Sequence, residues 1–327
     1  MRISTGQSEY HWHENWACVP ISESAENGWA HHGVAITEKG EIVSFHPGES
    51  TMLLFDSDGH LLRSWETDFT DAHGITIVNE DGVDYLWVAD NGRKRSYNMD
   101  YEYSDDETRG QAVKTTIYGD VVQRLKRPNL PVYENGMYSP TSVAINHDSG
   151  DIWVADGYGQ SYVHRYDRLG NYISSINGEE GAGRFDQPHS VFVDYRKSKA
   201  MLYVSDRANG RVQVYDMKGN FVRVFGSDFL TTPSAFAVHR DTMIIAELNA
   251  RLAVVDSEDK LIGYLGGNIP VTQLEGWPNN LDKLGVPTRT SLLEPGKFHS
   301  PHGMAVDSKG NIYVSEWLIG GRFIKLE

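Results

Sequence analysis

Three histidines occur in closely similar local sequences, AHGITI, PHSVFV and PHGMAV, as His73, His189 and His302. Each stands at the start of a short apolar segment. Three imidazoles on one ion leave a coordination position free for water or substrate, which suits catalytic zinc. We therefore expect these residues to hold a divalent transition metal, zinc in the first place and iron as a second choice, if the fold brings them together. The alternative is that histidine after proline favours this turn and bonds a neighbouring carbonyl.

Two further residues could take part in catalysis, Tyr158 and Arg207. They lie in similar segments, VADGY and VSDR. A phenol near a divalent cation loses its proton more easily than a phenol in water, so Tyr158 is a candidate catalytic base. A guanidinium can clamp a carboxylate or an oxyanion, which makes Arg207 a candidate catalytic clamp for the substrate. Structural roles stay open: Tyr158 as part of a hydrophobic wall, and Arg207 as the partner of an adjacent acid.

An internal repeat must position these residues. One sequence pattern recurs six times: a short apolar strand, a turn, and a second apolar strand. The first strands are expected at 31–36, 72–77, 140–145, 188–193, 233–238 and 301–306. The second strands end at Phe45, Asp90, Asp156, Asp206, Glu247 and Glu316. Asp-Gly, Leu-Gly and Lys-Gly turns indicate hairpins to third and fourth strands.

Six such units with almost no helical periodicity predict an all-β fold, a six-bladed β-propeller of four-stranded antiparallel blades. A β-sandwich would not repeat one motif at the same place in each unit. The last unit is one strand short, and the chain begins with YHWHENWACV. We expect this N-terminal segment to complete the last blade and close the ring, which removes an exposed sheet edge.

The whole chain, 1–327, is expected to form one domain. Two stretches break the spacing of the repeats, at about 94–138 and about 266–298. Loops of this length in a compact domain are commonly functional lids or mobile segments.

In a propeller, first strands begin and second strands end on the same face, so the residues at these positions share one funnel. Alternate blades of a six-fold ring are related by a pseudo-threefold axis, which lets His73, His189 and His302 converge. His32 opens the first blade and breaks the alternation. Two roles stay open for it, contact with the substrate or a structural role.

The other residues of this face are expected to be mostly structural. The repeated acids should bind backbone N–H groups at turns, although Glu247 is long enough to reach the funnel as a catalytic acid or base. Four other histidines are expected at the surface or in turns, namely His11, His13, His31 and His46.

Charge and composition exclude several partners. The net charge of −15 argues against nucleic acid, and the run Arg93-Lys94-Arg95 is expected to be a solvated loop. No apolar stretch is long enough for a membrane span, and no signal peptide is evident. With Cys18 as the only cysteine, no intrachain disulfide can form, and we expect a cytoplasmic location.

The motifs around the three histidines resemble those of propellers built from NHL-type repeats. Within that group, the chain is similar to the lyase domain of peptidylglycine α-amidating enzymes over most of the six units. The resemblance implies zinc on three histidines at blade openings, matched by AHG, PHS and PHG. It also implies a catalytic tyrosine in VADGYGQSYV, at Tyr158, and a substrate-binding arginine in VSDRANGRVQVYD, at Arg207.

The sequence departs from that family at three points. An active-site arginine has no match in SFHPGEST, Gly303 replaces an acidic residue that helps to bind structural calcium, and the family's disulfides cannot form. The resemblance therefore implies a metal-dependent lyase, or a related hydratase or hydrolase, for a small hydroxylated or carbonyl-containing substrate. The alternatives are a noncatalytic scaffold that binds a protein partner and, third, a lactonase-like hydrolase, whose oxygen ligands suit calcium.

Overall fold

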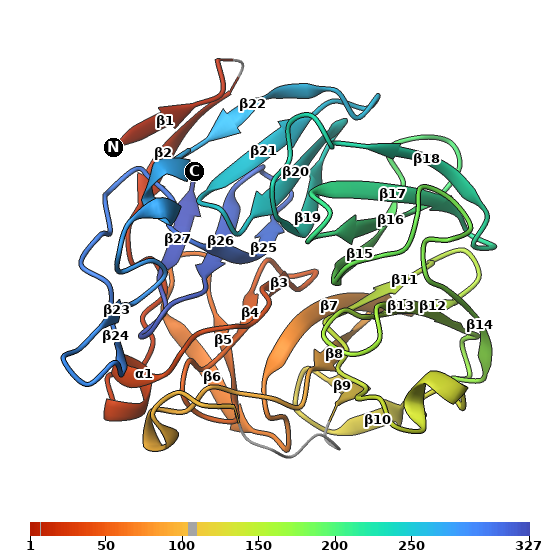
Figure 1. Ribbon diagram of the computed structural model, residues 1–327, viewed down its shortest axis with the longest axis horizontal. Helices are drawn as coiled ribbons and strands as arrows, with labels where there is room; N and C mark the ends of the chain where they lie inside the picture. The colour runs from red at the N-terminus through yellow and green to blue at the C-terminus, as the bar shows by residue number, and fades with distance from the viewer. Residues whose placement is uncertain (7, 104–109) are drawn as a thin grey trace.

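Short apolar segments joined by tight turns fold into antiparallel sheets arranged around one axis (Figure 1). The structure is a computed structural model, and it describes residues 1–6, 8–103 and 110–327. Six of its sheets form a six-bladed β-propeller, as predicted. No helix in these described ranges is both long and apolar enough to cross a membrane.

The first three blades follow the chain in order from the axis outwards. Blade 1 contains β3 (Ala35–Ile36), β4 (Ile42–Phe45), β5 (Thr51–Phe55) and β6 (Leu61–Glu66). Blade 2 contains β7 (Ala72–Glu80), β8 (Val83–Asp90), β9 (Gln111–Thr116) and β10 (Val121–Arg124). Blade 3 contains β11 (Ser142–Ile145), β12 (Ile152–Asp156), β13 (Tyr162–Tyr166) and β14 (Tyr172–Ile176).

The other blades repeat this plan, except that the last blade uses both ends of the chain. Blade 4 contains β15 (Pro188–Asp194), β16 (Met201–Asp206), β17 (Arg211–Asp216) and β18 (Phe221–Phe225). Blade 5 contains β19 (Pro233–His239), β20 (Thr242–Glu247), β21 (Arg251–Val255) and β22 (Leu261–Leu265). Blade 6 contains β25 (Pro301–Val306), β26 (Ile312–Glu316), β27 (Phe323–Leu326), β2 (Glu9–His13) and β1 (Arg2–Ser4).

The connections carry only short elements. These are α1 (Glu23–Asn27), the 3-10 helices η1 (Tyr97–Met99), η2 (Pro131–Tyr133) and η3 (Ile269–Gln273), and the hairpin β23 (Asn280–Leu281) with β24 (Pro287–Thr288). The stretch 266–298, predicted to be an insertion, lies between blades 5 and 6 and contains η3 and this hairpin. The stretch 94–138 is only partly one, because β9 and β10 of blade 2 lie inside it. Its residues 104–109 lie outside the described residues.

The hydrophobic core is divided into layers between adjacent blades. Between blades 1 and 2, for example, Val43 and Phe45 pack with Leu86 and Val88, and all four side chains are completely buried. Burial of one such side chain contributes roughly 1.5–3 kcal/mol. The layers hold neighbouring blades at fixed angles and thereby fix the residues at the axis.

The N-terminal strand closes the ring, as predicted. Strand β2 pairs with β27 through Trp12 and His13, and the two termini lie close together in Figure 1. The buried guanidinium of Arg322 reinforces the closure, since it pairs with Glu14 from the beginning of the chain and with Glu316 of blade 6.

Carboxylates at the ends of second strands accept hydrogen bonds from backbone N–H groups. Asp90 accepts hydrogen bonds from the backbone N–H groups of Thr70, Asp71 and Gly92. The same kind of acceptor role is held by Asp156, Asp206, Glu247 and Glu316. These carboxylates tie each second strand to the loop that precedes its blade.

Candidate metal centre

A backbone irregularity marks the start of the innermost strand in blades 2, 4 and 6. The register between first and second strands shifts across His73, His189 and His302. A β-bulge takes one residue out of the ladder and re-aims its side chain. In blades 2, 4 and 6 the residue taken out of the ladder is the histidine, and in blade 5 the same kind of shift takes out Ser234.

The three histidines meet at one point of the axis. The Nε2 atoms of His73 and His302 lie 3.1 Å apart. The ring of His189 lies 4.6 Å from that of His73 and 4.9 Å from that of His302, measured between centroids. Two nitrogens bound to one ion at about 2.0–2.1 Å are separated by about 3 Å, so the distance between His73 and His302 is that of two ligands of one metal.

Neighbouring blades orient these imidazoles through backbone carbonyls. The Nδ1 atom of His73 lies 2.7 Å from the oxygen of Thr141 in the opening of blade 3, and that of His189 lies 2.7 Å from the oxygen of Ser234 in blade 5. The Nδ1 atom of His302 lies 3.4 Å from the oxygen of His32 in blade 1. A carbonyl only accepts hydrogen bonds, so Nδ1 carries the proton and Nε2 keeps its lone pair.

Burial keeps these three imidazoles neutral. Desolvation lowers the pKa of His73, His189 and His302 well below the ordinary value, and the nearby Arg207 lowers it further. Metal ligands must be unprotonated. The three side chains are therefore in the ligating form at neutral pH.

The central atoms form a cage of acceptors with too few donors. The hydroxyl of Tyr158 lies 3.3 Å from Nε2 of His73 and 3.1 Å from Nε2 of His189, but it has only one proton to donate. Two lone pairs also face each other between His73 and His302. Because buried polar atoms are normally satisfied, the cage fits a bound cation.

Tyr158 and Arg207 both join this cluster. The Nη1 atom of Arg207 lies 3.2 Å from the Tyr158 hydroxyl, and its Nη2 atom donates to Gln187 at 2.7 Å. Burial raises the pKa of Tyr158 above its ordinary value, while Arg207 opposes that shift. The phenol is therefore protonated unless a further positive charge approaches it.

His31 also lies in the cluster, although it was expected at the surface or in a turn. Its side chain is buried, its Nε2 atom lies 3.0 Å from the Tyr158 hydroxyl, and its Nδ1 atom lies 3.1 Å from a carboxylate oxygen of Asp71. One ring nitrogen each of His31, His73 and His302 fits within 4.8 Å. The expectation was wrong because the blade 1 segment leading to β3 has no regular strand at 31–34, so the side chain does not follow the repeat.

His46 was likewise expected at the surface or in a turn. It lies in a turn and is buried, and its Nδ1 atom accepts the N–H groups of Gly48 and Glu49. The imidazole thereby accepts backbone N–H groups at this turn, as the carboxylates do in the other blades.

Two other candidates lie outside the cluster. The Nδ1 atom of His32 contacts Ser44 at 3.1 Å, and its ring stacks on Phe323, so this buried side chain points into the packing between blades 1 and 6. Its backbone carbonyl, rather than its side chain, contributes to the centre. The buried carboxylate of Glu247 is engaged by Thr231 and Arg251, which gives it a structural role like that of the other acids.

A cleft of about 530 Å³ opens above the cluster, a size typical of small-molecule sites. Tyr158, Arg207, Arg93, Arg95 and Trp317 are among its lining residues. Arg93 and Arg95 each lie 4.4 Å from the ring centre of Tyr103. The expectation of a solvated loop was wrong here, because the neighbouring Lys94 is drawn inwards to within 3.9 Å of the buried Asp71.

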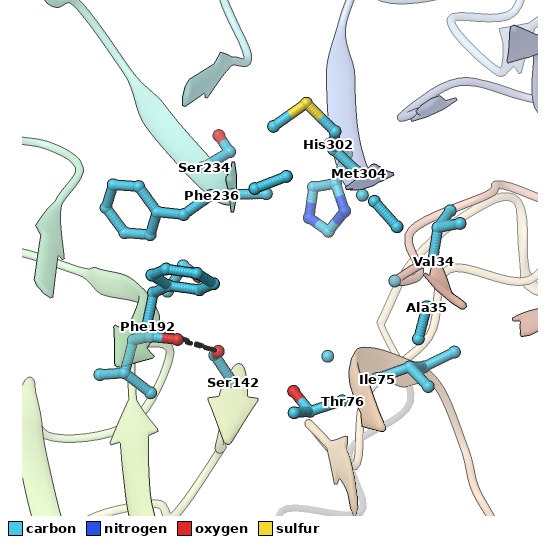
Figure 2. A pocket seen from close by; sticks show the side chains of 18 of the residues that line it. Val34, Ala35, Ile75, Thr76, Ser142, Phe192, Ser234, Phe236, His302 and Met304 are labelled. Carbon is cyan, nitrogen blue, oxygen red and sulfur yellow. Dashed lines mark hydrogen bonds between the residues drawn. The ribbon is translucent and has the colours of Figure 1, made fainter. Parts of the chain in front are cut away.

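On the other side of the histidines, an axial channel of about 330 Å³ runs between the inner strands. Figure 2 shows Ile75, Phe192, Phe236 and Met304 around it, with the His302 ring in the opening. No Asp, Glu, Lys or Arg among the described residues lines this channel. A Cβ on Gly303 would overlap the carbonyl oxygen of His32, so an acidic ligand for structural calcium has no room there.

Comparison with known proteins gives relatives along most of the chain, although no family model matches. NHL repeat-containing protein 3 of Homo sapiens is 30% identical over 282 residues, which cover 81% of this chain and 69% of that protein. The probable peptidyl-alpha-hydroxyglycine alpha-amidating lyase pgal-1 of Caenorhabditis elegans is 27% identical, over 87% of this chain and 79% of that protein. Peptidyl-glycine alpha-amidating monooxygenase A of Xenopus laevis is 27% identical, but the match covers only 30% of that protein.

Solved structures agree in fold. A streptogramin B lyase superposes with a TM-score of 0.61 at 13% identity, over 97% of both chains. A virginiamycin B lyase from Staphylococcus aureus gives a TM-score of 0.56 at 11% identity, over 97% of this chain and 99% of that one. Similarity at this level shows the propeller alone. The repeats, the ring of six blades and the sequence match to NHL repeat-containing protein 3 together show that the chain belongs to the family of NHL repeat-containing proteins, with amidating lyases among its homologues.

Proposed function

We propose that this protein is a metal-dependent lyase, or a related hydratase or hydrolase, that acts on a small hydroxylated or carbonyl-containing substrate. One observation carries the proposal: unprotonated imidazole nitrogens from blades 2, 4 and 6 converge beside Tyr158, and Tyr158 and His302 line the cleft. The amidating lyases among the relatives support the reaction class. Zinc or iron suits these nitrogen ligands better than calcium does, which disfavours the lactonase alternative.

In the proposed reaction His73, His189 and His302 hold the metal, which supplies a positive charge next to the phenol and the substrate oxygen. Tyr158, as the phenolate, would take the proton of a substrate hydroxyl while that oxygen forms a C=O bond and the C–N or equivalent bond breaks, and it would return the proton to the leaving group. Arg207, within hydrogen-bonding distance of the phenol oxygen, stabilises negative charge on that oxygen or on a substrate carboxylate. His32 and Glu247 have no part in this scheme, because neither side chain reaches the cleft.

Elemental analysis of protein purified without an affinity tag tests the metal. We expect about one zinc or iron per chain in the wild type and its loss in His189→Ala, with the fold kept as judged by circular dichroism. No transition metal in the wild type, even after reconstitution, would leave the noncatalytic scaffold, and the search would then turn to a protein partner. We continue to expect a cytoplasmic location.

Tyr158→Phe tests the base. This change removes one hydroxyl and keeps the ring, so metal content should stay at the wild-type value while turnover falls by about 10²–10⁴-fold, the usual contribution of general acid–base catalysis. Turnover is measured on the substrate found in a screen of lyase, hydratase and hydrolase reactions. Unchanged turnover would remove Tyr158 from the mechanism.

A further inference from the structure

A fourth imidazole, that of His31, is built into the centre in the same way as the other three. Its Nε2 atom lies 3.0 Å from the Tyr158 hydroxyl, and its ring centre lies 4.6 Å from those of both His73 and His302. A ring that only filled space beside the cluster would not need to present a nitrogen to it. His31 presents the same atom, Nε2, as the other three imidazoles.

The orientation of His31 is fixed by a buried carboxylate. Its Nδ1 atom lies 3.1 Å from Asp71 Oδ2, and the Asp71 side chain is fully buried. Asn91 donates to the same oxygen at 3.3 Å, and Lys94 Nζ lies 3.9 Å from the other one. A carboxylate behind an imidazole is a common outer-shell arrangement in metal sites, where it fixes the tautomer and raises the basicity of the ligating nitrogen.

Ring nitrogens of His31, His73 and His302 fit within 4.8 Å, and the Nε2 atom of His189 lies 3.1 Å from the Tyr158 hydroxyl that His31 also contacts. Each of the four imidazoles has its Nδ1 atom against an oxygen, a carbonyl for three of them and the Asp71 carboxylate for His31. Each turns Nε2 inwards, where only the Tyr158 proton is available for hydrogen bonding among the neutral groups.

We propose that His31 is a fourth protein ligand of the metal and that Asp71 is its outer-shell partner. This inference rests on the proposed function, in which His73, His189 and His302 bind the ion. Four imidazoles would fill a tetrahedral zinc site completely. A substrate position then requires a five- or six-coordinate ion, so the four-histidine set favours iron(II) or a similar octahedral metal over zinc.

The test uses His31→Asn, in which the amide still offers a donor to Asp71 but the Nε2 ligand is gone. The matched control is His164→Asn, which removes a buried imidazole that contacts Tyr133 and Ser175 outside the cluster. Asp71→Asn forms the third variant. Each protein is loaded with Fe²⁺ or Co²⁺, and affinity is measured by chelator competition, the number of bound imidazoles by X-ray absorption, and the fold by thermal unfolding.

We expect four imidazoles per ion in the wild type and three in His31→Asn, with an affinity at least about 100-fold lower. Asp71→Asn should lower metal affinity by about 10–100-fold, as outer-shell changes do. If His31→Asn does not fold, the metal affinity of Asp71→Asn decides the test. His164→Asn should bind like the wild type. Three imidazoles in the wild type and unchanged affinity in His31→Asn and Asp71→Asn would overturn the fourth ligand and leave the proposed function standing. A wild type that binds neither ion would overturn both.

Discussion

Even-numbered and odd-numbered blades share one hairpin pattern but contribute different groups to the axis. Blades 2, 4 and 6 open with an imidazole on a β-bulge. Blades 1, 3 and 5 supply at the equivalent place a backbone carbonyl, which receives the Nδ1 proton of the preceding histidine around the ring. A six-fold scaffold thus presents a threefold set of imidazoles, each of which is oriented by a carbonyl of the neighbouring blade.

The difference also shows where sequence can vary. An odd-blade opening contributes a main-chain atom, which any residue carries, so His32, Thr141 and Ser234 can differ in type. An even-blade opening contributes a side-chain atom and is histidine in all three cases. Blade 1 is the exception, since His31 adds a side chain on the odd side, in contact with Asp71 just before β7 of blade 2.

The largest expected effect is a difference in metal affinity between a variant at the opening residue of an even-numbered blade and one at the opening residue of an odd-numbered blade. His302→Ala removes a ligand and should lower metal affinity by at least about 100-fold, beyond the usual cost of outer-shell changes. Ser234→Ala keeps the carbonyl that orients His189 and should leave affinity within about twofold of wild type. Chelator competition measures both, and a similar loss in the two variants would contradict the division between blades.

A smaller effect is expected where an even blade touches an odd one. A Cβ on Gly74 would lie 2.5 Å from the oxygen of Thr141, the acceptor of the His73 proton. Gly74→Ala should lower the free energy of unfolding by about 1–3 kcal/mol through overpacking and weaken metal binding as well. Gly267→Ala is the control, because its nearest contact would be 4.0 Å, at Arg251. Urea unfolding and metal titration give the two readouts, and a loss of stability without a loss of affinity would show that the carbonyl does not position His73.

The smallest effect concerns a histidine of an odd blade that faces away from the metal. Burial lowers the pKa of His164 to about 3, and its ring contacts Tyr133 and Ser175. As the pH falls, the unfolded chain binds a proton at His164 before the folded chain does. The stability that neutral His164 contributes is therefore present in full above about pH 6.5 and is lost as the pH falls towards 3, by about 1.4 kcal/mol per pH unit. His164→Gln should remove about 2 kcal/mol of the loss between about pH 6.5 and 5.

The buried Asp156 works in the opposite direction. Burial raises its pKa to about 6, so its protonation in the folded state offsets part of the loss between pH 6 and its ordinary value. The measurement is therefore the difference between wild type and His164→Gln in urea unfolding at several pH values. Metal content should be the same in both proteins. Parallel pH profiles would assign the acid sensitivity to other groups.

The fold and three histidines could be predicted because both are periodic in the sequence. Each opening histidine is marked by its place before a recurrent apolar strand, and the structure brings all three together. The bulges that aim them could not be predicted, because they are backbone irregularities with no residue signature of their own. The carbonyl partners were missed for the same reason.

His31 was missed because the repeat was aligned on His32. A signal was present: the position before the opening is alanine or proline in the other five blades, and only blade 1 has histidine there. The prediction of a solvated loop at 93–95 was wrong because Asp71, a buried carboxylate earlier in the sequence, draws Lys94 inwards. Strands β9 and β10 were missed because Lys114, Gln123 and Arg124 interrupt their apolar pattern.

The closure of blade 6 has a consequence for how the chain folds. Glu14 and Arg322, which pair across the closure, lie 308 residues apart in the sequence. During synthesis β2 emerges first and waits with an unpaired edge until β27 has left the ribosome, and such edges and long-range pairings slow folding and favour aggregation. The ring can therefore close only after translation of the last blade, so assembly of the centre from blades 1, 2, 4 and 6 is a late event, and a metal acquired by the nascent chain would meet an incomplete set of ligands.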